Sequence, residues 1–457
     1  MSEITTINPA TEEVLKRYPL MSDAEMDGAL GAAHAAYQDW RKTSFEERAA
    51  VLRRIGEELR AVKGELGDLM TREMGKLRSQ TDGEVLAMAS ECDYLAENGA
   101  RFLATEEHEV SGRPAWVSYC PQGVIYGIQP WNFPVYQALR YTLPNLMAGN
   151  TVLLSHADNV TGCALMLGEI LARAGVPEGA FGVLLINHEQ SDKLIADARV
   201  RGVTFTGSFK GGSAVGRVAG EHAKKTVMEL GSNDAFLVLD DANLKQAVRE
   251  SVTGRIYNNG QTCVAAKRFI VTDGIYDDFR DAFTEAMAGV KYGDPFEKAH
   301  GLGPLAREDL RDNLHEQVQA SVDAGAKLLT GGVVPNETGY YYPATVLEDV
   351  EPGQPAYEDE LFGPAAALIR AKDDEDAMRI ANDSRFGLGG GIFSEDVDRA
   401  RSLAIEHFDT GMVNINGFGA AEENMPFGGT KDSGFGREHG AFGIREFVNI
   451  KAITMRG

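Results

Sequence analysis

Four short segments of the sequence carry side chains that could do chemistry, and the first of them contains Cys263. This cysteine follows Asn258-Asn-Gly-Gln-Thr262 in a loop directly before a predicted strand. A thiol beside amide side chains and backbone N–H groups can act as a nucleophile whose oxyanion accepts hydrogen bonds. A free cysteine is more often a small buried hydrophobic residue, and we keep that interpretation for Cys92, Cys120 and Cys163.

Glu229 and Asn132 are the candidates to assist such a thiol. Glu229 lies in Thr226-Val-Met-Glu-Leu-Gly231, at the end of an apolar strand, where partial desolvation would raise its pKa and suit it as a general base. The alternative is that it caps the next turn. Asn132 lies in Pro130-Trp-Asn-Phe-Pro134, whose prolines and aromatic residues would hold its amide where it could donate to an oxyanion.

The fourth segment, Phe205-Thr-Gly-Ser-Phe-Lys-Gly-Gly212, joins a predicted strand to a predicted helix. Gly207 and the backbone amides after it could therefore meet a dinucleotide phosphate at the N-terminus of that helix. The spacing of Gly207 and Gly212 does not match GxGxxG, so the standard Rossmann pattern is absent. A turn without a ligand is an equal alternative.

Alternating helices and strands must position these side chains. Residues 22–76 and 84–98 show helical periodicity, and after them short apolar runs such as Val124-Ile-Tyr-Gly-Ile128 alternate with amphipathic stretches. This alternation predicts right-handed crossovers and buried parallel sheets, with a boundary between two α/β halves near residue 231. The strand-like segments 114–119 and 447–455 belong to neither half and predict pairing between subunits.

Composition narrows the class of protein. The 457 residues are 43% hydrophobic, and 45 Lys plus Arg against 68 Asp plus Glu give a net charge of −23, which would repel nucleic acids and anionic membranes. Four cysteines without a CxxC exclude a disulfide framework and a cysteine zinc site, and no metal site is predicted. No apolar run approaches ~20 residues and the first residues do not resemble a signal peptide, so we expect a cytoplasmic protein.

Taken together, the segments resemble the aldehyde dehydrogenase superfamily. The resemblance runs from Asn8-Pro-Ala-Thr11 to Glu446-Phe-Val448, and it is strongest with bacterial succinate-semialdehyde dehydrogenases of the short type. The matching pieces, in the family's order and spacing, are Pro130-Trp-Asn-Phe-Pro134, Leu146-Met-Ala-Gly-Asn-Thr-Val152, Phe205-Thr-Gly-Ser208, Glu229-Leu-Gly231, Gly260-Gln-Thr-Cys263, Glu360-Leu-Phe-Gly-Pro364 and Pro426-Phe-Gly-Gly429.

This resemblance implies an α/β fold with two Rossmann-like parallel α/β domains and a small β oligomerisation arm. The implied dinucleotide-binding domain covers residues 1–102 and 122–231, and the implied catalytic thiol domain covers residues 232–430. Residues 103–121 and 431–457 would form the oligomerisation arm and tail. A homodimer or homotetramer follows from the same resemblance.

The resemblance also implies a mechanism. The Cys263 thiolate attacks an aldehyde, Asn132 and the backbone N–H of Cys263 hold the oxyanion, and hydride passes to NAD(P)+. Glu229 then activates the water that hydrolyses the thioester. Because relatives that transfer the acyl group to coenzyme A tend to lack this carboxylate, its presence favours release of a free acid.

The cofactor positions of the family contain two informative changes. Ser155 stands where a lysine usually binds the adenosine ribose or its 2′-phosphate, and a hydroxyl carries no charge to balance a phosphate. Asp158 matches a position where an acidic side chain accepts from the 2′-hydroxyl and repels a 2′-phosphate. Both predict that NAD is preferred over NADP, with a compensating charge from Lys210 as the alternative. The implied cofactor-binding residues are Trp131, Ser155, Asp158, Gly207, Ser208, Gly231, Glu360 and Phe362.

Two further departures concern a turn and a proton relay. Ser232 stands where the family usually has a second glycine after Glu229, so a positive φ there would force the turn to adjust. Tyr141 replaces a lysine of many relatives, which removes the side chain expected to relay protons.

The substrate prediction depends on Arg140, which lies nine residues after Trp131. In relatives that oxidise succinate semialdehyde an arginine at this place pairs with the distal carboxylate, and a guanidinium can bind a carboxylate bidentately. A surface arginine is the alternative. Some larger relatives add a second arginine where this chain has Tyr257, so help is expected from the loop 416–424. Glutarate semialdehyde, a neutral aliphatic aldehyde, and a non-catalytic nucleotide-binding or structural role remain as alternatives.

Overall fold

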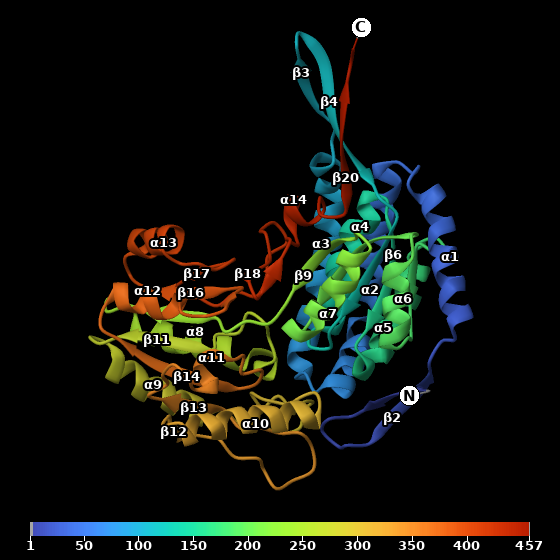
Figure 1. Cartoon of the computed structure of the whole chain (residues 1–457). Coiled ribbons are helices and arrows are strands. Elements are labelled where there is room, and N and C mark those ends of the chain that lie inside the picture. Colours follow the sequence, from blue (N-terminus) through green and yellow to red (C-terminus); the bar gives the residue numbers. More distant parts are fainter. Residues whose placement is uncertain (1–2, 457) are drawn as a thin grey trace.

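The structure is a computed structural model that describes residues 3–456. It has two lobes, and an arm projects from the first of them (Figure 1). The first lobe, coloured blue to green, is built from the N-terminal half of the chain, and the second, yellow to orange, from most of the remainder. Each lobe contains a mainly parallel sheet with helices, so the predicted α/β fold class is confirmed.

The sheet of the first lobe has the strand order β19-β9-β8-β5-β6-β7. Strands β5 to β9 pair in parallel, as the alternation in the sequence predicts, whereas β19 pairs antiparallel with β9. Their carboxyl ends share one edge, the usual position of a ligand site in open α/β sheets. The bounds are β5 Val124–Gln129, β6 Thr151–His156, β7 Phe181–Val183, β8 Val200–Thr206, β9 Lys225–Glu229 and β19 Gly434–Phe435.

The helical periodicity at residues 22–76 corresponds to two helices, because one helix ends at Trp40 and the next begins at Phe45. Each begins with a capping box; at Ser44 the hydroxyl accepts from the backbone N of Glu47 at 3.2 Å, and the Glu47 carboxylate accepts from the backbone N of Ser44 at 2.7 Å. The bounds are α1 Asp23–Trp40, α2 Phe45–Met74, α3 Arg78–Phe102, α4 Pro134–Ala148, η1 Asp158–Val160, α5 Thr161–Arg173, α6 His188–Ala196 and α7 Phe209–Glu221.

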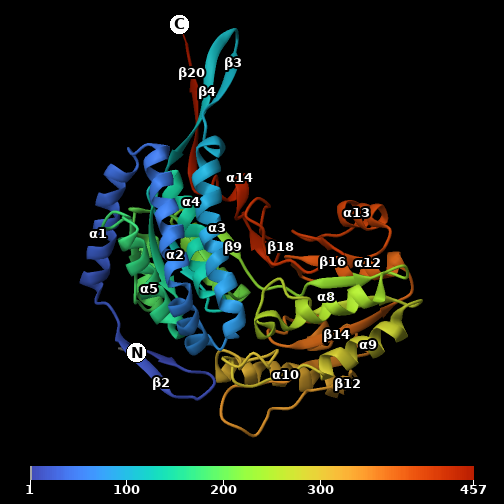
Figure 2. The ribbon, with the colours of Figure 1, turned by 180° about the vertical axis from the view of Figure 1, so that it is seen from behind.

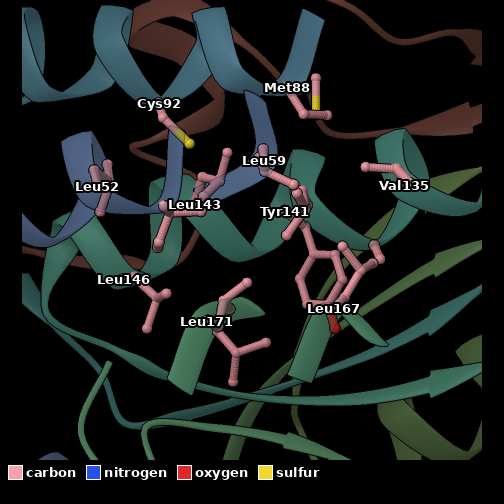
Figure 3. Close-up of a cluster of buried hydrophobic side chains, with 14 of the residues drawn as sticks. Leu52, Leu59, Met88, Cys92, Val135, Tyr141, Leu143, Leu146, Leu167 and Leu171 are labelled. Atoms are coloured by element: carbon pink, nitrogen blue, oxygen red, sulfur yellow. The ribbon is translucent and has the colours of Figure 1, made fainter. Parts of the chain in front are cut away.

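An apolar cluster joins α2, α3, α4 and α5 (Figure 3). Leu59, Cys92, Leu143 and Leu167, one from each helix, are fully buried. Burial of a leucine side chain contributes about 1.5–3 kcal/mol, so this cluster fixes α4 and the loop that precedes it. Cys92 is a packing residue here, as predicted, and so is the fully buried Cys163.

The sheet of the second lobe has the order β12-β13-β14-β11-β10-β16-β17, and only β12 runs antiparallel to its neighbour among these described strands. The strand bounds are β10 Ala235–Val238, β11 Arg268–Thr272, β12 Lys327–Thr330, β13 Thr345–Glu348, β14 Ala365–Ala371, β16 Gly390–Phe393 and β17 Asn414–Ile415. The helix bounds are α8 Leu244–Ile256, η2 Tyr257–Gly260, α9 Tyr276–Ala288, α10 Glu308–Asp323, α11 Pro355–Glu358, α12 Asp374–Asn382 and α13 Val397–Glu406.

The arm is a three-stranded antiparallel sheet of β3 (Glu106–Val110), β4 (Arg113–Pro121) and β20 (Val448–Thr454), in the order β20-β4-β3. It contains the segments 114–119 and 447–455 that the sequence predicts as unassigned strands. The arm stands away from both lobes, at the end of the molecule opposite the N-terminal hairpin of β1 (Glu3–Ile7) and β2 (Val14–Pro19) (Figure 2).

The segment after residue 430 returns to the first lobe before it reaches the arm. β18 (Thr430–Lys431) pairs with β15 (Phe386–Gly387), β19 then pairs with β9, and α14 (Gly440–Gly443) follows. This return places residues 434–440 beside Glu229. Between residues 3 and 456, no helix is long and apolar enough to cross a membrane.

Candidate active site

Cys263 lies in a loop of the second lobe whose backbone is unusually bent. Asn258, Asn259 and Gly260 have φ values of 54°, 57° and 75°, and a Cβ at Gly260 would lie 2.3 Å from the carbonyl carbon of Gly363. Only glycine fits that close approach. The buried Lys267 ammonium donates to the Cys263 carbonyl at 2.5 Å, and this hydrogen bond helps to hold the loop in place.

A cavity of about 180 Å³ opens in front of Cys263, between α3, α4 and the loop that contains residues 420–427. Its wall is mainly apolar and small or aromatic, so it suits a short substrate. The lining residues are Gly83, Glu84, Ala87, Phe133, Tyr136, Gln137, Tyr257, Thr262, Cys263, Val264, Ala420, Ala421 and Phe427.

Asn132 lies against the cysteine loop, as its predicted role requires. Its Nδ2 donates to the Gln261 carbonyl at 3.1 Å, and its own carbonyl accepts from Asn258 Nδ2 at 2.7 Å. The Asn132 side chain is 3% exposed. Two segments that are 126 residues apart in the sequence are thus held together by hydrogen bonds between backbone and amide groups.

Glu229, at the end of β9, is buried, and neither carboxylate oxygen has a hydrogen-bond partner among the described residues. Burial, and next the negative charge of Glu438, raise the pKa of Glu229 well above its usual value. A Cβ at Gly428 would lie 2.8 Å from Glu229 Oε1, so glycine keeps space beside the carboxylate. An unpaired buried carboxyl group of raised pKa is suited to accept a proton.

The thiol itself is poorly ionised in this setting. Burial raises the pKa of Cys263 to about 12, although the positive charges of Arg140 and Lys267 oppose this rise. A reactive thiolate therefore needs a base to take its proton, and Glu229 is close enough for its charge to act on Cys263.

The environment of Arg140 differs from the one expected for a substrate anchor. Arg140 is 1% exposed, does not line the cavity in front of Cys263, and forms an ion pair with Glu438. Its Nη2 also donates to Thr206 Oγ1 at 3.0 Å. A carboxylate would have to compete with Glu438 for this guanidinium, because the buried pair already balances both charges.

A second cavity, of about 550 Å³, opens at the carboxyl edge of the first sheet. Trp131, Ser155 and Asp158 line it, as do Gln129 and Asn159. The side-chain amides of Gln129 and Asn159 have no hydrogen-bond partner within the described chain, which favours a polar ligand that would supply them. The volume, the edge position and these amides fit a nucleotide cofactor.

The five remaining predicted cofactor residues are not among those that line this cavity, and three of them, Gly207, Ser208 and Phe362, adjoin its lining residues in the chain or in space. Ser208 is the N-cap of α7, where its hydroxyl accepts from the backbone N of Gly211 at 3.1 Å, and Gly207 follows the lining residue Thr206. Phe362 packs edge-on against Trp131, with ring centroids 5.7 Å apart. A Cβ at Gly231 would lie 2.7 Å from Glu360 Oε2, so these two residues are in direct contact.

The two departures at Ser232 and Tyr141 are accommodated without strain. Ser232 does not have a positive φ, its backbone N donates to Glu360 Oε1 at 3.1 Å, and its Oγ accepts from Lys267 Nζ at 2.9 Å. Tyr141 is buried and donates to the Leu153 carbonyl at 3.2 Å, which leaves it as a structural residue of α4.

Three polar residues of this site are not identified in the sequence analysis. Glu438 and His439 approach α4 from the segment after β19, and they contact Arg140 and Tyr136 respectively. Lys267, the residue before β11, donates to the backbone carbonyl of Cys263 in the cysteine loop. No local pattern marks these side chains, because their partners lie far away in the sequence. In residues 3–456 there is no group of three or more His, Cys, Asp or Glu side chains arranged to hold a metal ion.

Comparison with known proteins adds independent information. Residues 1–453 match the model of the aldehyde dehydrogenase family. The chain is 45% identical to the succinate semialdehyde dehydrogenase [NAD(P)+] Sad of Escherichia coli strain K12, over 98% of this chain and 97% of that one. It is 43% identical to the succinate-semialdehyde dehydrogenase [NADP(+)] 1 of Mycobacterium tuberculosis strain H37Rv, over 98% and 99%.

Solved structures agree with these matches. The succinic semialdehyde dehydrogenase of Streptococcus pyogenes in complex with NADP+ superposes with a TM-score of 0.97 at 37% identity, over 99% of this chain and all of that one. The lactaldehyde dehydrogenase of Escherichia coli superposes with a TM-score of 0.96 at 31% identity, over 100% and 96%.

Proposed function

The chain belongs to the aldehyde dehydrogenase family, and from that premise we propose that it oxidises succinate semialdehyde to the free acid. The enzyme class is an NAD(P)-dependent aldehyde dehydrogenase. The observation that carries the substrate proposal is 42–45% identity, over nearly the whole chain, to relatives named succinate-semialdehyde dehydrogenases. The small cavity in front of Cys263 is consistent with a short aldehyde.

We assign the chemical steps as follows. Glu229 takes the proton of Cys263, and the thiolate attacks the aldehyde carbon. The resulting oxyanion accepts from Asn132 Nδ2, which must leave the Gln261 carbonyl, and from the backbone N–H of Cys263. The bound nicotinamide cofactor supplies the hydride acceptor. Glu229 passes the thiol proton to solvent and then deprotonates a water molecule, which attacks the thioester carbon; the C–S bond breaks, the acid leaves and the Cys263 sulfur is released.

The cofactor is held by residues of both the sheet edge and the second lobe in this proposal. Trp131, Ser155 and Asp158 would contact its adenosine half, and Gly207 and Ser208 would receive its phosphates at the N-terminus of α7. Gly231, Glu360 and Phe362 would hold the nicotinamide half.

A direct assay tests the proposed substrate. NAD(P)H formation is measured with succinate semialdehyde, glutarate semialdehyde and butanal. We expect the highest kcat/KM with succinate semialdehyde. A higher value with either other aldehyde would contradict the substrate assignment, and no turnover with any of them would favour a non-catalytic homologue.

Replacement of Asn132 by alanine tests the oxyanion assignment. We expect kcat to fall by roughly 10²–10³-fold, the usual loss when one oxyanion donor is removed. Steady-state kinetics at saturating cofactor measure this change. Asn132→Asp keeps the shape but not the N–H donor, so it should lose as much; retention of kcat in either variant would remove Asn132 from the mechanism.

We propose that NAD is preferred over NADP. Ser155 and Asp158 both line the cavity at the edge of the first sheet; Ser155 has no positive charge to balance a 2′-phosphate, and the Asp158 carboxylate would repel one. Burial raises the pKa of Asp158, while the nearby charges of His188 and Arg307 oppose that rise. The charges of His188 and Arg307 argue for NADP instead, and so do the names of the two relatives above, which give NAD(P)+ and NADP(+) as their cofactors.

The variant Asp158→Asn tests this preference. Loss of one negative charge should raise kcat/KM for NADP by about tenfold relative to NAD, since tenfold corresponds to roughly 1.4 kcal/mol. Kinetics with both cofactors measure the ratio. The exposed Asp192→Asn, on α6, is the matched control and should leave the ratio unchanged. A wild-type preference for NADP would contradict the proposal.

We further propose a homodimer or homotetramer that pairs through the arm, whose outer strands β3 and β20 each have one edge without a partner among the described strands. Sedimentation analysis of the full chain measures the mass, and a monomer would contradict the proposal. Four free cysteines support the cytoplasm as the compartment.

A further inference from the structure

A chain of three hydrogen-bonded side chains lies behind the wall of the substrate cavity. Tyr136 Oη and His439 Nε2 are 2.7 Å apart, and His439 Nδ1 and Glu91 Oε2 are 3.3 Å apart. The side chains of His439 and Glu91 are each 2% exposed. Because Tyr136 lines the cavity in front of Cys263, the chain connects a buried carboxylate of α3 to the substrate cavity.

The backbone at His439 supports a role for its side chain. Its φ of 61° and ψ of 166° belong to a region that side-chain-bearing residues rarely adopt. Glycine would occupy this position without strain. The imidazole is therefore held against an unfavourable backbone, stacked on Tyr136 with ring centroids 5.6 Å apart.

Two protonation states of this chain present different groups to the cavity. With a neutral imidazole, Nδ1–H donates to Glu91 and the Tyr136 hydroxyl donates to Nε2, so the phenol oxygen offers only lone pairs. With an imidazolium, Nδ1–H donates to Glu91 and Nε2–H donates to Tyr136. The Tyr136 O–H is then free to donate to another acceptor.

We propose that Tyr136, His439 and Glu91 form a proton-linked recognition element for the charged end of the substrate. A substrate carboxylate accepts from the Tyr136 hydroxyl, and this contact requires His439 to bind one proton. A neutral aldehyde gains nothing from that proton. The inference rests on the proposed function. The Tyr136 hydroxyl gives the substrate carboxylate a hydrogen-bond donor, which Arg140 does not readily provide because it is paired with Glu438.

The groups around His439 agree with such a link. From α3 it faces Glu91, and from α4 it faces Tyr136; Arg140, one turn further along α4, lines a small cavity together with His439. Its own segment supplies Glu438, whose charge interacts with the imidazole. Arg437 and Glu446 line the same small cavity as His439, Arg140 and Glu438 and complete the set of charged groups near the imidazole.

The first test is the variant Tyr136→Phe, which removes only the hydroxyl. We expect the ratio of KM for succinate semialdehyde to KM for butanal to rise by about tenfold or more, because a hydrogen bond to a charged group is lost. Tyr292→Phe is the matched control and should leave the ratio unchanged, because Tyr292 packs against Tyr341 and does not line the cavity. An unchanged ratio in Tyr136→Phe would overturn the inference.

The second test uses pH and does not depend on the stability of any variant. In the wild type, the same KM ratio, measured from pH 6 to pH 9, should rise with pH, because a neutral imidazole accepts the hydrogen of the Tyr136 hydroxyl. Ionisation of Cys263 and Glu229 affects both aldehydes and cancels in the ratio. In His439→Gln, whose amide donates at every pH, the ratio should not change with pH. A wild-type ratio that is flat overturns the inference even if succinate semialdehyde is the best substrate.

The two proposals fail in different ways. If the wild type oxidises butanal but not succinate semialdehyde, the proposed function is overturned and the inference falls with it. If succinate semialdehyde is oxidised well but the ratio responds neither to pH nor to Tyr136→Phe, only the inference is overturned.

Discussion

Replacement of Cys263 by alanine should abolish NAD(P)H formation from every aldehyde, with a loss in kcat of at least about 10⁴-fold. Removal of the nucleophile leaves no atom to form the covalent intermediate, and losses of this order follow when a catalytic nucleophile is deleted. Stopped-flow and steady-state measurement of NAD(P)H both test this result, because even a single turnover should be lost. Cofactor binding, measured by calorimetry, should persist, since Cys263 does not line the cavity of Trp131 and Ser155.

A cysteine elsewhere in the chain provides the control. Cys120 lies in β4 of the arm and is partly exposed, so its replacement by alanine should leave kcat within about twofold, as expected for surface substitutions away from a site. Activity of Cys263→Ala within tenfold of the wild type would exclude a covalent mechanism at this residue.

Replacement of Glu229 by glutamine should lower steady-state turnover by roughly 10²–10⁴-fold, the range associated with loss of a general base. The amide keeps the shape of the side chain but cannot take a proton. If hydrolysis is the step most affected, a first burst of NAD(P)H should remain visible, followed by a slow steady rate. Rapid mixing with succinate semialdehyde measures the burst and the steady rate separately.

The pH profile gives Glu229→Gln a second readout. Burial and the charge of Glu438 raise the pKa of Glu229, and a base acts only when it is deprotonated. The wild-type kcat should therefore rise with pH through this raised pKa, and the rise should be absent in Glu229→Gln. Glu250→Gln, in α8 and far from the cavity, should keep the wild-type profile. A profile unchanged in Glu229→Gln would assign the base to another group.

The raised pKa of Glu229 and the ion pair of Arg140 with Glu438 have one structural origin. Strand β19 returns from the second lobe to pair with β9, so Gly434 lies opposite Glu229 and the following residues reach α4. This return brings Glu438 next to Arg140 and His439 next to Tyr136. Carboxylates, imidazole and guanidinium from three distant segments thus share one buried region.

Much of the site could be predicted from local sequence. Cys263, Glu229 and Asn132 stand out because each combines a reactive or polar side chain with the glycines, prolines and aromatic residues of a turn that must hold it. The two parallel sheets follow from the alternation of apolar runs with amphipathic helices, since a crossover connection is required between parallel strands. The domain limits near residues 231 and 430 remain predictions, as do the individual roles of the site residues.

The sequence by itself determined the fold class, the family and the candidate catalytic residues, because these depend on patterns within short segments. Only the tertiary structure decided the charge environment of each residue. The sequence predicts that the Arg140 guanidinium is free to bind a substrate carboxylate. In the structure Glu438, 298 positions later, forms a buried ion pair with it. Ionic and hydrogen-bonded partners at such separations leave no local pattern, since their energies depend on distance and burial in space and not on position along the chain.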